Sequence, residues 1–103
     1  MITISIGNET KNYADATESW IAQQINRRRL DGQNVCVDIL VNTSGLNIQL
    51  TTPGCDAGGG GGREATDRER RLFDLWDKHG LNSPNFSGGS LISFLKWLRQ
   101  LVA

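Results

Sequence analysis

The sequence predicts a small α+β domain in two layers, with a three-stranded sheet that packs its apolar face against helices. Alternation of apolar and polar side chains, typical of half-buried strands, occurs in three segments: 2–6, 35–41 and 46–51. Apolar residues recur at helical spacing in three others: 15–30, 66–79 and 91–102. A run of five glycines, 58–62, lies between the last strand and the second helix.

The first half of the chain is predicted to be a β-α-β-β unit. Gly7 and Asn8 end the first strand, and the following helix begins at Asp15, with Glu18 placed three residues later as in a capping box. Asp31-Gly32 is a typical helix end. The next two strands form a hairpin. The helix makes a right-handed crossover if the strands on either side of it are parallel.

The second half is predicted to be a pair of helices that pack on the sheet. Thr66 and Glu69 form a capping box at the start of the first, which runs to about His79 before Gly80. The segment LISFLKWLRQLV forms the last helix. About forty residues rarely form a stable core alone, so we expect this pair to dock on the apolar sheet face.

The chain of 103 residues suits one small domain. We divide this domain, 1–103, into a β-α-β-β half (1–52), a flexible glycine-rich loop (53–63) and a helical pair (64–103). Glycine loses the most backbone freedom on ordering, so we expect the Ala57–Gly62 run to be mobile.

Charge and composition exclude several classes of protein. Eleven basic and eleven acidic residues give a formal net charge of zero, which disfavours a dedicated nucleic-acid binder. No apolar run approaches the ~18 residues that span a bilayer, and the N-terminus is too polar for a signal peptide. We therefore expect a cytoplasmic protein with both cysteines reduced and no disulfide between Cys36 and Cys55.

The glycine run does not match a catalytic or cofactor-binding motif. A phosphate-binding loop needs a Lys and a Ser or Thr after the last glycine, and Arg63 and Glu64 stand there. A reactive thiol needs a base, and His79 is the only histidine. A groove lined by Cys36, Asp38 and His79 would favour a thiol-dependent enzyme. We expect no enzymatic activity, no metal and no cofactor.

Two groups of residues are candidates for binding anions. Arg27, Arg28 and Arg29 end the first helix, where cations also favour the helix dipole. Ser87, Gly88 and Gly89 precede the last helix, whose free N–H groups could hold an anion. Ordinary capping by Ser87 is the favoured explanation of the second group.

Three apolar residues are candidates for binding a partner. The last helix has an apolar arc wider than that of an ordinary surface helix, with Trp97 at one edge and Ile92 beyond the other. Two neighbours within the domain cover this arc, which is the favoured interpretation, or one edge is left for a partner. Phe73, in the preceding helix, is the third. We expect a non-enzymatic protein-interaction or regulatory module whose partner is another protein or a second copy of this chain. The alternatives are a weak nucleic-acid or anion binder that uses Arg27–Arg29, and a thiol-dependent enzyme.

Overall fold

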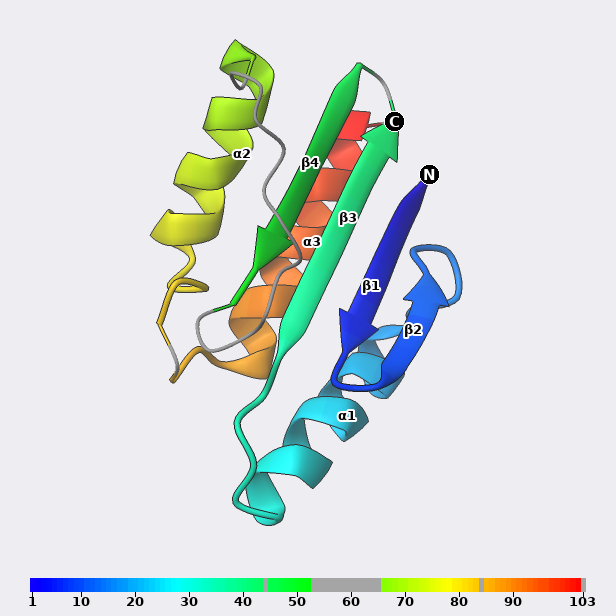
Figure 1. The fold of residues 1–103 in the computed structure, drawn as a ribbon, viewed down its shortest axis with the longest axis vertical. Helices are drawn as coiled ribbons and strands as arrows, with labels where there is room; N and C mark the ends of the chain where they lie inside the picture. Colours follow the sequence, from blue (N-terminus) through cyan, green and yellow to red (C-terminus); the bar gives the residue numbers. More distant parts are fainter. Residues whose placement is uncertain (44, 53–65, 84, 103) are drawn as a thin grey trace.

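The structure is a computed structural model that describes residues 1–43, 45–52, 66–83 and 85–102. The described chain is α+β, with a four-stranded sheet and three helices (Figure 1). The elements in chain order are β1 (Ile2–Ile6), β2 (Glu9–Asn12), α1 (Glu18–Leu30), β3 (Val37–Thr43), β4 (Leu46–Thr51), α2 (Asp67–Lys78) and α3 (Gly88–Val102).

The sheet has the strand order β2-β1-β3-β4, and each pair of neighbours is antiparallel. The prediction of three strands is therefore wrong, because β2 was missed. All four residues of β2, ETKN, are polar and exposed, so no alternation of hydrophobicity marks this edge strand. Gly7 is a hairpin turn residue between two strands, and its φ of 61° is the left-handed conformation that glycine adopts readily.

The crossover helix is present, but it connects different strands from those predicted. β1 and β3 are antiparallel, so no crossover joins them. α1 leaves from β2 and leads to β3, and these two strands are parallel to each other with β1 between them. The chain is thus a split β-α-β unit to which β4 is added as a hairpin.

α1 begins two residues later than predicted. Thr17 is the N-cap, and its Oγ1 accepts a hydrogen bond of 3.1 Å from Trp20 N. The predicted cap, Asp15, belongs to the preceding turn, where its N–H donates to Asn12 O. The helix ends as predicted, because Asp31 is the C-cap and Gly32 has a φ of 72°.

The capping box of α2 is confirmed. Thr66 Oγ1 accepts a hydrogen bond from Glu69 N at 3.2 Å, and Glu69 Oε1 accepts one from Thr66 N at 2.9 Å. α2 ends at Lys78, with Gly80 in the left-handed conformation shortly after it. α3 begins at Gly88, three residues before the start that its apolar pattern predicted.

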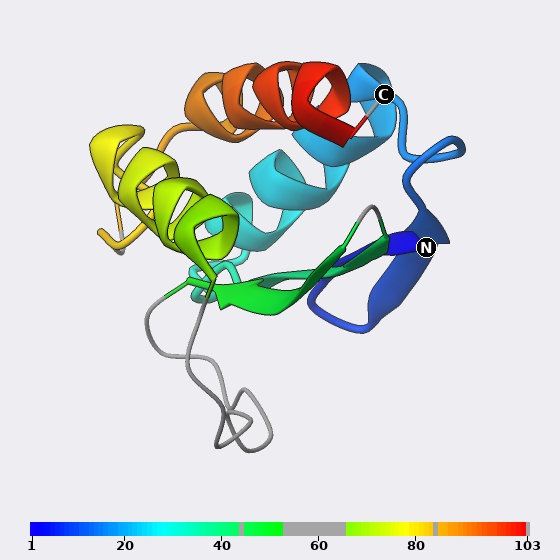
Figure 2. The same ribbon diagram turned by 90° about the horizontal axis from the view of Figure 1, so that it is seen from above.

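The helices cover one face of the sheet, as predicted (Figure 2). Alternate strand residues, including Ile4, Val37 and Ile48, point into a single core with the apolar sides of the helices. The largest buried helix residues are Ile21, Ile25, Leu72, Trp76, Leu91, Phe94, Leu95 and Leu98. The predicted division into halves stays a prediction, and the glycine-rich loop with its predicted mobility lies outside the described residues.

The expectation of reduced thiols is wrong for Cys36, which is disulfide-bonded. Cys55, the only other cysteine of the sequence, lies outside the described residues. The expectation rested on an assumed reducing compartment. Residue spacing alone does not tell whether two cysteine Cα atoms come within the roughly 4.4–6.8 Å that a disulfide needs. None of the helices described is long and apolar enough to cross a membrane.

Candidate functional site

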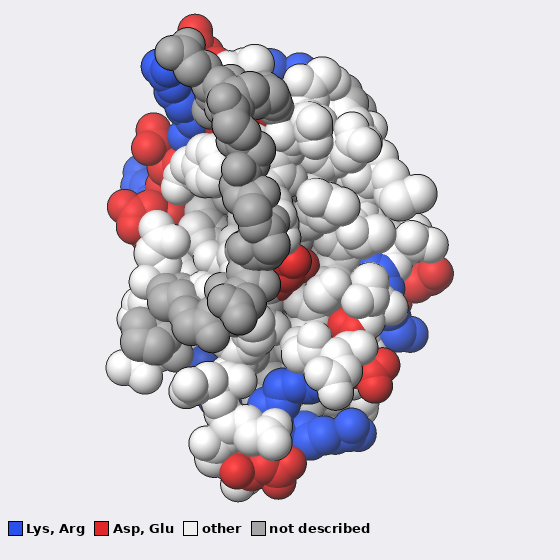
Figure 3. Space-filling view, in the orientation of Figure 1, with Lys and Arg blue, Asp and Glu red and all other residues white. Residues whose placement is uncertain are grey.

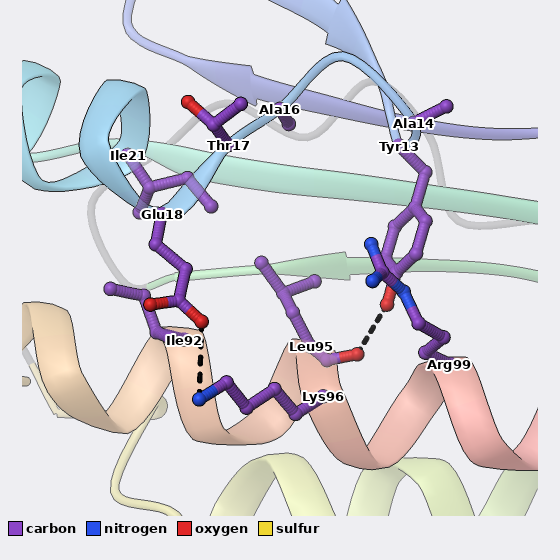
Figure 4. Close-up of a pocket in the computed structure, with 10 residues that line it drawn as sticks. All are labelled: Tyr13, Ala14, Ala16, Thr17, Glu18, Ile21, Ile92, Leu95, Lys96 and Arg99. Atoms are coloured by element: carbon purple, nitrogen blue, oxygen red, sulfur yellow. Dashed lines mark hydrogen bonds and ion pairs between the residues drawn. The ribbon is translucent and has the colours of Figure 1, made fainter.

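A cavity of about 270 Å³ opens between α3 and the segment that leads into α1 (Figure 4). Its wall combines apolar side chains from three parts of the chain with charged side chains at the mouth. The apolar residues are Ala14, Ala16, Ile21, Ile92 and Leu95. Tyr13 and Thr17 complete the wall, and the charged residues are Glu18, Lys96 and Arg99.

The cavity lies where two antiparallel helices meet. Glu18, at the start of α1, pairs with Lys96 in the second half of α3. Two turns further along α1, the Ile25 side chain lies beside Gly88 at the start of α3, because a Cβ atom added to Gly88 would be 3.6 Å from Ile25 Cδ1. The two helices therefore run in opposite directions side by side, and Ile21 lies between these two contacts.

The segment before α1 forms the remaining wall of the cavity. Tyr13 N still donates to Ile2 O at 2.9 Å, as an extension of the β1–β2 ladder. The chain then turns sharply, because Asp15 N and Ala16 N both donate to Asn12 O at 3.0 Å. After this turn the chain passes from the sheet to the helix layer. The Tyr13 side chain points toward α3 (Figure 4).

Two polar bridges join the cavity walls. The Tyr13 hydroxyl donates a hydrogen bond to the backbone carbonyl of Leu95. Glu18 Oε1 lies 3.1 Å from Lys96 Nζ, with both side chains more than 60% exposed. Such an exposed ion pair contributes at most about 1 kcal/mol to stability. The Tyr13 bridge is the partly buried one and fixes the position of the ring.

Arg99 gives the mouth of the cavity a positive charge. Its guanidinium lies 5.0 Å from the centre of the Tyr13 ring, a cation–π distance. Among the described residues no carboxylate forms an ion pair with Arg99, while Glu18 and Lys96 neutralise each other. The charges around the cavity thus leave one cation available to a ligand.

The cavity is small, and its lining is about equally polar and apolar. Ile21 and Leu95 are buried, and the partly buried Ile92 packs against them at the rim. Pockets for drug-sized ligands usually measure about 300–1,000 Å³, so this cavity suits one large side chain better than a nucleotide or a flavin. Its chemistry is that of a site for an apolar group adjoining an anion.

The structure separates the three residues predicted to bind a partner. Ile92 lines the cavity. Trp97 lies about 140° further round α3 at 100° per residue, and it packs partly buried against the core. Phe73 is 42% exposed on α2. Only Ile92 therefore belongs to the cavity, and the binding role of the other two stays a prediction.

The arginines at the end of α1 make contacts within the fold. Arg28 Nη1 donates to the Gln24 side-chain oxygen at 2.6 Å. Arg29 donates to the backbone carbonyl of Phe86 and lies over the Phe86 ring at 5.1 Å. Arg27 is exposed in the last turn of α1. Two of the three guanidinium groups are thus partly occupied, and anion binding by Arg27, Arg28 and Arg29 stays a prediction.

The second group of anion candidates forms the start of α3. Ser87 Oγ accepts a hydrogen bond from Ser90 N at 3.0 Å, which is an ordinary N-cap contact. Gly88 faces Ile25 of α1, and Gly89 is exposed. The capping interpretation of Ser87 is confirmed, and anion binding by Ser87, Gly88 and Gly89 stays a prediction.

The residues considered for a thiol enzyme lie apart. Asp38 is on the sheet face opposite the helices, where its carboxylate accepts hydrogen bonds from Gln49 at 2.8 Å and Thr51 at 3.4 Å. His79 follows α2, with its ring edge-on to Phe94 in the helix layer. Cys36 is disulfide-bonded. The structure therefore does not form the groove of Cys36, Asp38 and His79.

Sequence reasoning missed most of the cavity. Lys96 and Arg99 follow Ile92 by four and seven residues, a spacing that places all three on one side of a helix and was available as a signal. Tyr13 and Glu18 come from the other half of the chain, and nothing in their local sequence indicates a contact with α3. Across the described ranges, no three His, Cys, Asp or Glu side chains gather as they would around a metal ion.

No protein-family model matches the chain, and no curated protein or solved structure is significantly similar to it.

Proposed function

We propose that this protein is a small interaction module whose α1–α3 cavity accepts one large apolar side chain of a protein partner. The observation that carries the proposal is the combination of a cavity of about 270 Å³, partly lined by the apolar side chains of Ile21, Ile92 and Leu95, with an Arg99 guanidinium that forms no ion pair with an acidic side chain among the described residues. The expected partner segment carries a Leu or Phe next to an Asp or Glu.

The apolar side chain would supply most of the binding free energy. Burial of a Leu or Phe side chain contributes about 1.5–3 kcal/mol. The cavity already exists between helices held by the core, so little reorganisation opposes this gain. Ile92, at the rim, would contact the incoming side chain first, and Leu95 would lie beneath it.

The carboxylate would determine which apolar segments bind. Arg99 is held over the Tyr13 ring, so its guanidinium is positioned before the partner arrives. An ion pair at this exposed mouth contributes about 1 kcal/mol or less. The same charge repels a basic segment, so acidic and basic partners differ by about twice that amount.

One anchor of this kind gives weak binding. The two contributions together amount to at most about 4 kcal/mol, which corresponds to a dissociation constant of about 1 mM or weaker for a short peptide. A physiological interaction would need further contacts or several copies of the module. Weak, exchangeable binding is consistent with a regulatory role and needs no catalytic residue.

The disulfide of Cys36 bears on where the interaction takes place. Disulfides persist in oxidising surroundings and are rare in the cytosol. We therefore expect the partner in an oxidising compartment and not in the cytoplasm that the sequence suggested. Alkylation of thiols in intact cells, followed by mass analysis of Cys36, distinguishes the two locations.

The test is an NMR titration of the labelled full chain with three short peptides. The peptides contain Phe between two aspartates, Phe between two lysines, and Ala between two aspartates. We expect the first to shift the resonances of Ile21, Ile92 and Leu95, and the other two to bind at least about fivefold more weakly. Equal binding of the acidic and basic peptides, or shifts confined to another surface, would refute the proposal.

Two variants sharpen the test. Ile92→Trp should fill the cavity and abolish the shifts, and Arg99→Glu should reverse the preference between the acidic and basic peptides. Arg27→Glu makes the matching charge change at the exposed end of α1, away from the cavity, and should leave the titration unchanged.

A further inference from the structure

The outer side of α2 carries an apolar side chain with charged neighbours. Phe73 is 42% exposed and is the large apolar residue on the exposed side of this helix. Arg70 precedes it by one turn, Asp74 is adjacent, and Asp77 follows by one turn. Acidic and basic side chains alternate along the side of the molecule where α2 lies (Figure 3).

The charged neighbours of Phe73 are available for contacts with another molecule. Arg70 and Asp74 are exposed, and neither has an ion-pair partner in the part of the chain that is described. Asp77 Oδ1 accepts a hydrogen bond from Asn82 Nδ2 at 3.0 Å, which leaves its second oxygen open.

This arrangement has the features of the ligand expected for the cavity. An aromatic side chain stands beside carboxylates, as required by a partly apolar cavity with Arg99 at its mouth. The basic Arg70 lies on the opposite side of Phe73 from Asp77 along the helix axis. When Asp77 faces Arg99, that contact is complementary in charge, and the basic Arg70 points away from Arg99.

We infer that a second copy of this chain inserts Phe73 into the α1–α3 cavity. This inference rests on the function proposed above. The same chain does not supply the side chain, because α2 packs beside β4 while the cavity lies between α1 and α3 (Figure 2). The donating and accepting surfaces differ, so the contact is heterologous and adds chains head to tail.

The test uses complementary variants of the full chain. Phe73→Ser removes the donated side chain and keeps the cavity, and Ile92→Trp fills the cavity and keeps Phe73. By analytical ultracentrifugation between about 10 µM and about 1 mM, a range that covers weak association, the unmodified chain should gain mass with concentration. Each variant alone should stay monomeric.

An equimolar mixture of the two variants should form a dimer and no larger species. Only one functional donor and one functional cavity remain in the mixture, so growth stops after one contact. Leu30→Ser removes an apolar side chain that is 87% exposed at the end of α1, and it should associate like the unmodified chain. Circular dichroism confirms that each variant is folded.

The charge contacts give a second, independent readout. Arg99→Glu and Asp77→Lys should each weaken association at least about fivefold, and the mixture should recover part of the loss. A chain that stays monomeric near 1 mM while the acidic Phe peptide still binds would overturn this inference and leave the proposed function standing. Association that the mixture of Phe73→Ser and Ile92→Trp fails to restore would place the interface elsewhere and would also overturn it.

Discussion

Glu69 Oε2 accepts a hydrogen bond of 2.7 Å from the backbone N–H of Asn47, which ties the first turn of α2 to β4. The other oxygen of the same carboxylate accepts the Thr66 N–H of the capping box. Glu69 is completely buried. One side chain therefore caps the start of the helix, joins it to the edge of the sheet and accepts hydrogen bonds from two backbone N–H groups.

Glu69→Ala should lower the free energy of unfolding by about 2–5 kcal/mol, because it removes the hydrogen bonds that a buried carboxylate accepts from two backbone N–H groups. Glu69→Gln keeps one acceptor oxygen and should lose about half as much. Urea unfolding of both variants measures this, with Glu18→Ala as the control for an exposed carboxylate. Equal small losses for Glu69→Ala and Glu18→Ala would show that the contact with Asn47 contributes little.

Trp76 presents the opposite case, a buried polar group whose Nε1 has no hydrogen-bond partner among the described residues. Its side chain is 2% exposed, and its ring meets Phe94 edge-on, with the ring centres 5.3 Å apart. Trp76→Phe removes the unsatisfied donor and keeps an aromatic contact. The gain of about 1–3 kcal/mol and the cost of a smaller side chain should nearly cancel.

We therefore expect Trp76→Phe to unfold within about 1 kcal/mol of the unmodified chain, and Trp76→Ala to lose about 3–5 kcal/mol. Thermal and urea unfolding of the two variants give the comparison. A loss for Trp76→Phe as large as that for Trp76→Ala would mean that the Nε1–H is satisfied in solution, for example by a buried water.

The sequence predicted the elements whose signals are local. Burial on one face imposes a period of two on β3 and β4, and that period is readable without knowing what covers the face. The capping box of Thr66 and Glu69 is contained within four residues. The glycine ends of α1 and α2 depend only on backbone conformation at Gly32 and Gly80.

The elements that were missed depend on tertiary contacts. β2 has no apolar residue, and it forms because β1 offers an unpaired edge two residues away. Asp15 and Thr17 are both good N-caps, and the choice between them follows from the Asn12 turn that occupies the Asp15 N–H. The cavity could not be predicted from local sequence either, because it joins Tyr13 and Glu18 to residues about eighty positions later in the chain.

The disulfide of Cys36 should contribute to stability. Removing a native disulfide from a small domain typically costs about 2–5 kcal/mol. A reducing agent should therefore lower the unfolding temperature of the unmodified chain and leave that of Cys36→Ser unchanged. Thiol titration of the unfolded, unreduced chain should find no free thiol, and two titratable thiols in that sample would contradict the assignment.

Substitutions of Tyr13 distinguish the contribution of its hydroxyl hydrogen bond from the contribution of its ring packing. Tyr13→Phe removes the hydroxyl that donates to the Leu95 carbonyl and keeps the ring beneath Arg99. That carbonyl retains its helical hydrogen bond, so the loss of stability should be only about 0.5–1.5 kcal/mol. Tyr13→Ala also removes the ring that packs against the core, and it should cost about 2–4 kcal/mol.

The two Tyr13 substitutions should affect peptide affinity in a different proportion from that in which they affect stability. If the ring positions Arg99, Tyr13→Phe keeps the affinity for the acidic Phe peptide within about twofold, and Tyr13→Ala loses at least about fivefold. Titrations at a temperature where both variants are folded measure this. Equal affinities for Tyr13→Ala and Tyr13→Phe would mean that Arg99 binds the carboxylate without being positioned by the Tyr13 ring. A large loss with Tyr13→Phe alone would assign the selective contact to the hydroxyl.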